Sequence, residues 1–269
     1  MNRLPPKKSL GQNFLTSIPA RMKIVEAGEI IPTDIILEIG PGKGFLTKAL
    51  LATGAHVVAL EKDRALIPFL SETFSTPLAS NQLTLIEGDV LVFDPARYRL
   101  QANGYKLVAN IPYYITGAIL SRFLTNLHQP STMVVLVQKE VAERICARDA
   151  KESLLSLSVK AYGDPKLVYR VNKGSFHPIP SVDSAVLQIK NISRTNFTSA
   201  RHEEVFFKLI RAAFAHKRKF ALSNTASVFI DTDIASLFKE ANLSEKVRAE
   251  DVALLSWIQI SKRISSKPE

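Results

Sequence analysis

The sequence predicts an α/β domain built on a parallel sheet, followed by a small all-α domain. Short apolar runs alternate with segments of helical spacing between residues 35 and 137, which is typical of strand–helix–strand units. A glycine-rich turn follows the first apolar run directly. Beyond residue 200 only helical spacing remains, so we expect the strands to lie in the first part of the chain.

The elements of the α/β part follow from these runs. Residues 35–39 (IILEI) predict a buried strand that ends at the glycine-rich turn. Residues 45–52 predict a helix stopped by Gly54, and residues 56–60 (HVVAL) predict the second strand. The same reasoning predicts helices at 64–74 and 116–127 and strands at 83–86, 106–109 and 133–137. Right-handed crossovers between such strands give a parallel sheet covered on both faces.

The rest of the chain is predicted to contain further helices and strands up to residue 190, then a linker, and then helices only. Helices are expected at 138–147 and 152–161, and strands at 166–172 and 184–190 around a proline-rich loop. Residues 191–200 are polar and predict a linker. Helical spacing then recurs at 202–215, 219–226, 231–241 and 247–260. We therefore expect a first domain over 1–190, a linker over 191–200 and a helical domain over 201–269.

Composition excludes several classes of protein. The 269 residues are 46% hydrophobic and 22% charged, as in ordinary soluble domains. The longest apolar run, residues 133–137, is far shorter than the ~20 residues that cross a bilayer. Cys146 is the only cysteine, and no ligand spacing such as His-Glu-x-x-His occurs, so neither a disulfide nor a metal site is expected. The basic start of the chain lacks a signal-peptide core, which favours a cytoplasmic location.

Positive charge gathers at the two ends of the chain. The formal net charge is +10, from 35 basic and 25 acidic residues. Residues 1–23 hold five basic residues and no acidic ones, and residues 191–269 hold 13 basic and 9 acidic ones. Residues 24–190 are nearly neutral, with 17 basic and 16 acidic residues. This distribution favours a polyanionic partner, in particular a nucleic acid, bound from two sides.

Three polar features follow successive predicted strands. The turn at 38–44 (EIGPGKG) has the spacing G-x-G-x-G, which differs from the dinucleotide motif and from the phosphate-binding P-loop. Glu61 ends the next strand, where a carboxylate can accept hydrogen bonds from a ribose diol. Asp89 follows the third strand and can accept from an adenine amino group. Because parallel strands end at one edge of the sheet, these groups predict a single ligand pocket there.

The segment that decides the expected reaction is 110–114 (NIPYY), directly after the strand at 106–109. The side-chain oxygen of Asn110 and the carbonyl oxygen of Ile111 can accept both hydrogens of an exocyclic amine. Tyr113 can stack on the ring that carries the amine. Two acceptors on its hydrogens favour a localised nitrogen lone pair, and orientation of the reacting atoms is then the main task of the site.

These motifs together resemble the ribosomal RNA adenine N6-dimethyltransferase family. The resemblance rests on 110–114 and 38–44, and on the N-terminal 8–15 (KSLGQNFL). Residues 138–144 (QKEVAER) and 176–186 (FHPIPSVDSAV) also match, and the resemblance extends from residue 7 to about 225. The family includes small-subunit (kasugamycin-sensitivity) enzymes and the Erm resistance methylases.

The resemblance implies a Rossmann-like domain that uses S-adenosylmethionine, with a helical C-terminal domain. The positions expected to bind the cofactor are Gln12, Asn13, Leu15, Gly40, Gly42, Glu61, Lys62, Asp89, Val90 and Asn110. The positions expected to act on the target adenine are Asn110, Ile111, Tyr113 and Phe176, with Phe176 as the second wall of the base pocket. The product would be N6,N6-dimethyladenosine.

The C-terminal residues 211–219 (RAAFAHKRK), followed by Asn224, are more similar to the small-subunit branch than to the Erm branch. The triplet 217–219 reads Lys-Arg-Lys where an arginine-rich triplet is expected, which preserves charge but not bidentate phosphate contacts. The expected partner is small-subunit rRNA in a pre-assembled particle of the 30S type, bound by a monomer during ribosome assembly. RNA contacts are expected at Lys7, Lys8, Arg211, Lys217, Arg218 and Lys219.

Three other functions fit part of this pattern. An Erm-type enzyme would act on large-subunit RNA, which the basic C-terminal segment disfavours. A DNA adenine methylase is expected to have Asp or Asn followed by Pro-Pro-Tyr rather than the Ile-Pro-Tyr of 111–113. A non-catalytic RNA-binding assembly factor would favour degraded motifs, and the motifs here are intact.

Overall fold

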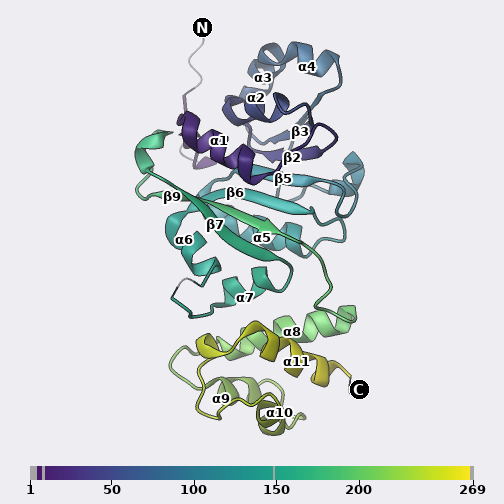
Figure 1. Ribbon diagram of the computed structural model, residues 1–269, viewed down its shortest axis with the longest axis vertical. Coiled ribbons are helices and arrows are strands. Elements are labelled where there is room, and N and C mark those ends of the chain that lie inside the picture. The colour runs from purple at the N-terminus through teal and green to yellow at the C-terminus, as the bar shows by residue number, and fades with distance from the viewer. Residues whose placement is uncertain (1–4, 8–9, 148, 267–269) are drawn as a thin grey trace. The chain divides into compact units, whose positions relative to one another are not determined.

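The computed structural model describes residues 5–7, 10–147 and 149–266 (Figure 1). The chain forms two compact units. Unit 1 comprises Met1–Ala142 and Asp164–Ile192, and unit 2 comprises Glu143–Gly163 and Ser193–Glu269. Residues 143–163 were expected in the first domain but group with the C-terminal helices. Their apolar spacing predicts a helix with one buried face, but it does not identify the unit against which that face packs.

Unit 1 contains a mixed sheet, which in the described residues has seven strands in the order β4-β3-β2-β5-β6-β9-β7. Their bounds are β4 (Leu83–Glu87), β3 (His56–Glu61), β2 (Ile35–Ile39), β5 (Lys106–Asn110), β6 (Thr132–Gln138), β9 (Ser184–Lys190) and β7 (Asp164–Val171). The pairs from β4 to β6 are parallel, as predicted. The strands around the proline-rich loop, β9 and β7, add antiparallel pairs at the edge.

Helices cover both faces of this sheet, as the crossover rule predicts (Figure 1). The chain moves outward one way from β2 through α2 (Phe45–Leu51) to β3, and on through α3 (Ile67–Thr73) to β4. It moves the other way from β5 through α5 (Thr116–Leu124) to β6, so α5 lies on the opposite face. The shorter helical segments of unit 1 are η2 (Arg64–Leu66), α4 (Ser75–Ala79), η3 (Pro95–Tyr98), η4 (Tyr113–Ile115) and η5 (Lys173–Ser175).

Several elements of unit 1 were not predicted, among them one helix and two short strands near the start and end of its chain segments. The helix α1 (Ile18–Ala27) is capped by the Ser17 hydroxyl, which accepts from the backbone N–H of Ala20 at 3.3 Å. Ile18 and Met22 are exposed, so the apolar residues of α1 do not form the single stripe by which a helix is recognised. The two-residue strands β1 (Phe14–Leu15) and β8 (Phe176–His177) pair antiparallel, and they are too short to give a sequence pattern.

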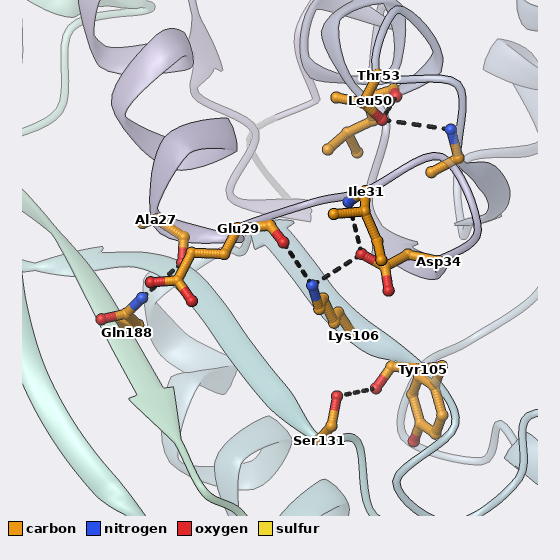
Figure 2. Close-up of polar contacts among 11 residues, drawn as sticks. Ala27, Glu29, Ile31, Asp34, Leu50, Thr53, Tyr105, Lys106, Ser131 and Gln188 are labelled. Atoms are coloured by element: carbon orange, nitrogen blue, oxygen red, sulfur yellow. Dashed lines mark hydrogen bonds and ion pairs between the residues drawn. The ribbon is translucent and has the colours of Figure 1, made fainter.

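Polar contacts fasten the amino-terminal end of the parallel strands (Figure 2). The Nζ of Lys106, at the start of β5, donates to the Glu29 carbonyl oxygen and to Asp34 Oδ2, both at 2.7 Å. The Nε2 of Gln188 donates to the Ala27 carbonyl oxygen at 2.6 Å. These bonds tie the end of α1 and the loop after it to β5 and β9, at the end of the sheet opposite the carboxyl ends of the parallel strands.

Unit 2 is helical and has its own core. Its elements are α7 (Leu154–Lys160), α8 (Ala200–Ala213), α9 (Ala221–Ala226), α10 (Ile234–Glu240), η6 (Ala249–Asp251) and α11 (Leu254–Ser265), and α6 (Lys139–Ile145) crosses the boundary between the units. Phe206, Phe238 and Trp257 are fully buried. Within the expected linker 191–200, Phe197 packs on Phe206 with ring centroids 5.4 Å apart. None of the helices in the described residues is long and apolar enough to span a membrane.

Candidate functional site

A cavity of about 870 Å³ lies at the carboxyl ends of the parallel strands of unit 1. Its lining includes the ends of β2, β3 and β5, the segments that follow β2, β3, β4 and β5, and residues 10–16. The predicted site residues that line it are Gln12, Asn13, Leu15, Gly40, Gly42, Glu61, Lys62, Asp89, Val90, Asn110, Ile111 and Tyr113. The fold therefore brings most of the expected site together at the edge where open α/β sheets bind ligands.

The turn after β2 requires glycine at several positions. Gly40, Gly42 and Gly44 all have positive φ, at +69°, +59° and +75°. A Cβ on Gly42 would lie 2.9 Å from the Phe14 ring, and one on Gly44 would lie 2.3 Å from the Phe74 ring. On Gly40 a Cβ would meet only the Asn110 carbonyl oxygen, at 3.9 Å. The turn thus packs tightly on one side and presents bare backbone to the cavity.

Glu61 ends β3 and is held rigidly by backbone donors. Its Oε2 accepts from the N–H of Gly42 at 3.0 Å, and its Oε1 accepts from the N–H of Asp63 at 2.8 Å. Burial raises the pKa of Glu61, and the two backbone donors oppose that rise. Each carboxylate oxygen keeps a further lone pair, so the group can still accept from a ligand diol.

Lys62, directly after β3, and Asp89, after β4, form an ion pair at the carboxyl ends of these strands. The Nζ of Lys62 donates to Asp89 Oδ2 at 2.8 Å, and the N–H of Leu91 donates to Asp89 Oδ1 at 3.0 Å. The bond from Lys62 is the main reason that the pKa of Asp89 is lowered. Asp89 is therefore an ionised acceptor at the rim of the cavity, beside the buried side chain of Val90.

Asn110 ends β5 with its side-chain amide oriented by one contact. Its Nδ2 donates to the carbonyl oxygen of Asn13 at 3.2 Å. A carbonyl oxygen can only accept, so the amide nitrogen must face Asn13. The Oδ1 of Asn110 is then directed away from this contact and is the group that can accept from a ligand.

Tyr113 is anchored through its hydroxyl. The Tyr113 Oη lies 2.6 Å from Oγ of Ser184, a buried residue of β9. Burial raises the pKa of Tyr113, so the hydroxyl is neutral near pH 7. With its hydroxyl held, Tyr113 offers its ring as a fixed wall of the cavity.

Phe176 does not lie where it was expected. It is 3% exposed and belongs to the core cluster beside Leu15, its partner in the β1–β8 pair. Among the described residues it is the neighbouring His177, and not Phe176, that lines the cavity. Successive side chains of a strand point to opposite faces, so His177 faces the cavity when Phe176 faces the core.

Glu38 belongs to the glycine-rich motif but was given no role from the sequence. It is 1% exposed and lines the cavity, and neither its Oε2 nor Oγ1 of Thr47 has a hydrogen-bond partner in the described part of the chain. Burial, opposed by the neighbouring Thr47, raises the pKa of Glu38 to about 8. The sequence signal was an acid within the apolar run IILEI, because a glutamate is rarely fully buried unless it is paired.

The expected RNA-binding residues lie in both units. In unit 1, Lys7 Nζ forms an ion pair with Asp63 Oδ1 at 2.6 Å, and Lys8 lies outside the described residues. In unit 2, Lys217, Arg218 and Lys219 are exposed in the turn between α8 and α9, and the guanidinium of Arg211 lies 5.7 Å from the Phe207 ring centroid. In the described residues, no group of three His, Cys, Asp or Glu side chains could hold a metal ion.

Comparison with known proteins identifies the family. A family model described as "Ribosomal RNA adenine dimethylase" matches residues 4–266. The chain belongs to the ribosomal RNA adenine dimethylase family. A relative from Dehalococcoides mccartyi, named "Ribosomal RNA small subunit methyltransferase A", is 40% identical over 267 residues, covering 98% of this chain and 90% of the relative. A relative of the same name from Fusobacterium nucleatum is 38% identical over 259 residues, covering 95% of this chain and 96% of the relative.

Solved structures agree with this dimethylase fold. A dimethyladenosine transferase from Plasmodium falciparum aligns with a TM-score of 0.78 at 24% identity, over 92% of this chain and 95% of that chain. The 23S rRNA methyltransferase ErmE aligns with a TM-score of 0.75 at 23% identity, over 93% of this chain and 99% of that chain. The predicted α/β methyltransferase fold with a helical C-terminal part is thereby confirmed.

Proposed function

We propose that this dimethylase transfers methyl groups from S-adenosylmethionine to the N6 amine of adenosines in small-subunit rRNA, giving N6,N6-dimethyladenosine. The observation that carries the proposal is the arrangement of Asn110. Its amide nitrogen is occupied by Asn13, and its Oδ1 is left to accept from an amine in the same cavity as Glu61 and Asp89.

The chemistry of the cavity fits S-adenosylmethionine. The glycine turn leaves backbone exposed where a Cβ would enter, Glu61 can accept from a ribose diol, and Asp89 can accept from an adenine amino group. The buried Oε2 of Glu38, which has no hydrogen-bond partner in the described residues, is a further polar group that can hydrogen-bond to the cofactor. When bound, S-adenosylmethionine supplies a methyl group activated by the adjacent sulfonium.

The chain's own residues orient the target amine. The Oδ1 of Asn110 and the carbonyl oxygen of Ile111 accept its two hydrogens, which leaves the nitrogen lone pair for the methyl carbon. Losing one such preorganised polar group typically costs about 2.7–4 kcal/mol of transition-state stabilisation. The ring of Tyr113, held by Ser184, stacks on the base, a contact worth roughly 1–3 kcal/mol. The monomethyl amine still offers one hydrogen, so a site that admits it can run the reaction twice.

The names of the relatives and the charge of the chain support the choice of RNA. The relatives from D. mccartyi and F. nucleatum are named for the small subunit, whereas the likeness to ErmE concerns the fold. The basic triplet 217–219 is exposed and can meet phosphates. The proposal includes a cytoplasmic monomer that acts on a pre-assembled 30S-type particle.

The test is mass spectrometry of nucleosides from RNA incubated with the protein and labelled S-adenosylmethionine. We expect labelled N6,N6-dimethyladenosine in unmethylated small subunits. Large-subunit RNA and adenine-containing duplex DNA, treated in the same way, should stay unlabelled. Label confined to large-subunit RNA or DNA would overturn the choice of substrate, and no label in any of the three would overturn the enzymatic function.

A further inference from the structure

Asp63 is a buried carboxylate next to the cavity-lining residue Lys62, and its side chain accepts hydrogen bonds from two residues of the N-terminal segment. It lies two residues after Glu61, and its side chain is 4% exposed. Its Oδ1 accepts from Lys7 Nζ at 2.6 Å and from the Ala65 N–H at 3.0 Å, and its Oδ2 accepts from Gln12 Nε2 at 3.1 Å. Burial alone would raise the pKa of Asp63, but these donors outweigh it and hold that pKa below its usual value.

The same residue touches the cofactor site through its backbone. The N–H of Asp63 donates to Oε1 of Glu61 at 2.8 Å, on the carboxylate proposed to bind the ribose. The side chain of Asp63 therefore accepts hydrogen bonds from two residues of the N-terminal segment, Lys7 and Gln12. Its backbone N–H donates to Glu61, the proposed acceptor for the ribose. Such a residue can couple the position of the segment to the position of Glu61.

Lys7 and Gln12 are also tied to each other. The backbone N–H of Lys7 donates to Gln12 Oε1 at 2.7 Å, and the N–H of Leu10 donates to the Lys7 carbonyl oxygen at 3.1 Å. The amide of Gln12 thus has its oxygen on Lys7 and its nitrogen on Asp63. Both ends of this side chain are engaged within the protein, as expected for a structural tie.

The residues that follow reach across the cavity to the amine-binding side. Residues 10–15 line the cavity, and a Cβ on Gly11 would lie 3.0 Å from the Tyr114 ring. The Asn13 carbonyl oxygen holds the amide of Asn110. The segment is fastened at Asp63, beside the ribose acceptor, and again at Asn110, beside the target amine.

We propose that Asp63 is a positioning residue that latches Lys7 and Gln12 at the rim of the cavity, so that residues 10–15 close over the bound cofactor. The proposal rests on the function proposed above and refines it. Gln12 acts through Asp63 rather than by contacting the cofactor, and the charge of Lys7 is used on Asp63 rather than on RNA phosphate. Coupling of this kind is reciprocal, so cofactor binding should also order the segment.

The experiment uses S-adenosylhomocysteine, with affinity measured by calorimetry and backbone protection by hydrogen exchange. The variants are Asp63→Asn, Lys7→Met and the double variant. We expect each single variant to bind the ligand on the order of 5- to 150-fold more weakly, the usual range of a coupling between sites. The double variant should lose no more than Asp63→Asn, because Lys7 acts through Asp63. The ligand-induced protection of residues 10–15 should disappear, while that of β2 and β5 remains.

The matched control is Glu87→Gln. Glu87 is paired in register with Glu61 at the end of β4, is half exposed and does not line the cavity as described. It should bind the ligand like the unchanged protein. If Asp63→Asn does not fold, Gln12→Leu and Lys7→Met, which change less buried positions, provide the same measurements.

The outcomes separate the latch from the function on which it rests. If the unchanged protein fails to bind S-adenosylhomocysteine, the proposed cofactor is wrong. If it binds but the variants bind equally well with residues 10–15 still protected, the latch is wrong. Additive losses in the double variant, or loss of protection throughout β2 and β5, would make Asp63 a residue of general stability and also overturn the latch.

Discussion

The side-chain nitrogen of Asn110 lies 3.2 Å from the carbonyl oxygen of Asn13, a residue 97 positions earlier in the chain. This bond decides which end of the amide is available to a ligand. It also joins the two motifs on which the family resemblance chiefly rests, residues 8–15 and 110–114. The N-terminal motif thus contacts the proposed amine-binding side of the cavity as well as lining the proposed cofactor side.

Replacing Asn110 tests this assignment directly. Asn110→Ala removes the proposed acceptor for the target amine, and we expect the single-turnover rate to fall by about 10²–10³-fold, the usual effect of deleting one preorganised polar group. Affinity for S-adenosylhomocysteine should change little, because the ribose and adenine acceptors remain. A near-normal rate in single-turnover experiments would refute the role of Asn110.

Glu61→Ala should have the opposite profile. A contact to the ribose diol is the same in the ground state and the transition state, so its loss should raise the KM for S-adenosylmethionine much more than it lowers kcat. Calorimetry with the cofactor measures the affinity, and rates at saturating cofactor measure the chemical step. Unchanged affinity would show that Glu61 serves only to hold the turn at Gly42.

The strands of the sheet were predictable because each follows from a local pattern. Buried parallel strands appear as continuous apolar runs, and residues 35–39 form β2 within the bounds that the sequence indicates. The cavity followed from the same observation, since polar residues after successive parallel strands must meet at one edge. Glu61, Asp89 and Asn110 accordingly all line it.

What could not be predicted depends on contacts between distant segments. The pairing of Leu15 with Phe176 gives no sequence pattern, yet it turns Phe176 into the core and His177 into the cavity. The grouping of α7 with the C-terminal helices follows from packing: within unit 2, Tyr162 just after α7 stacks on Phe207 of α8. Neither partner can be identified from the residues on one side of the contact alone.

Substitutions at Phe176 and His177 should therefore have different effects on the free energy of unfolding. Phe176→Ala leaves a cavity in the core of unit 1, and we expect the free energy of unfolding to fall by about 3–5 kcal/mol. His177→Ala changes an exposed position and should alter it by no more than about 0.5 kcal/mol. Urea unfolding measures both. If Phe176→Leu keeps normal stability and cofactor affinity but loses methylation, Phe176 is a wall of the base pocket after all.

Glu38 predicts a pH dependence of stability with a definite sign. Its pKa is raised from 4.5 to about 8 by burial, so between these values the folded protein holds a proton that the unfolded chain has lost. The contribution of Glu38 to stability is full below about pH 4.5 and is lost as the pH rises toward 8. Glu38→Gln removes this titration, so its stability relative to the unchanged protein should increase from pH 5 to pH 8.

Urea unfolding at intervals across this range provides the check on Glu38. The matched control is Glu87→Gln, which changes an exposed glutamate at the end of β4. A difference for Glu38→Gln that stays constant with pH would mean that Glu38 is ionised in the folded protein. The same unfolding curves should shift when S-adenosylhomocysteine is added, because a ligand that binds only the folded state stabilises it.

The last prediction concerns the basic triplet of unit 2. Lys217, Arg218 and Lys219 are exposed in the turn between α8 and α9. Buried Asn224 supports this turn, because its Nδ2 donates to the carbonyl oxygens of Ala213 at 2.8 Å and His216 at 3.1 Å. A supported turn presents its three charges in a defined place, which suits contact with a phosphate backbone. We expect the triplet to bind rRNA outside the catalytic cavity.

Reversing all three charges to Glu should therefore weaken binding to small subunits and reduce its salt dependence. Each phosphate contact contributes up to about 0.9 to the slope of log affinity against log salt on duplex, so the slope should become shallower by up to about 2.7. Affinity for S-adenosylhomocysteine should stay the same, because the cofactor cavity is lined by unit 1 alone in the described residues. Filter binding over a salt series and calorimetry measure the two quantities. If the triple variant binds and methylates pre-assembled small subunits normally at physiological salt, the triplet is only a solvated surface and rRNA docks elsewhere.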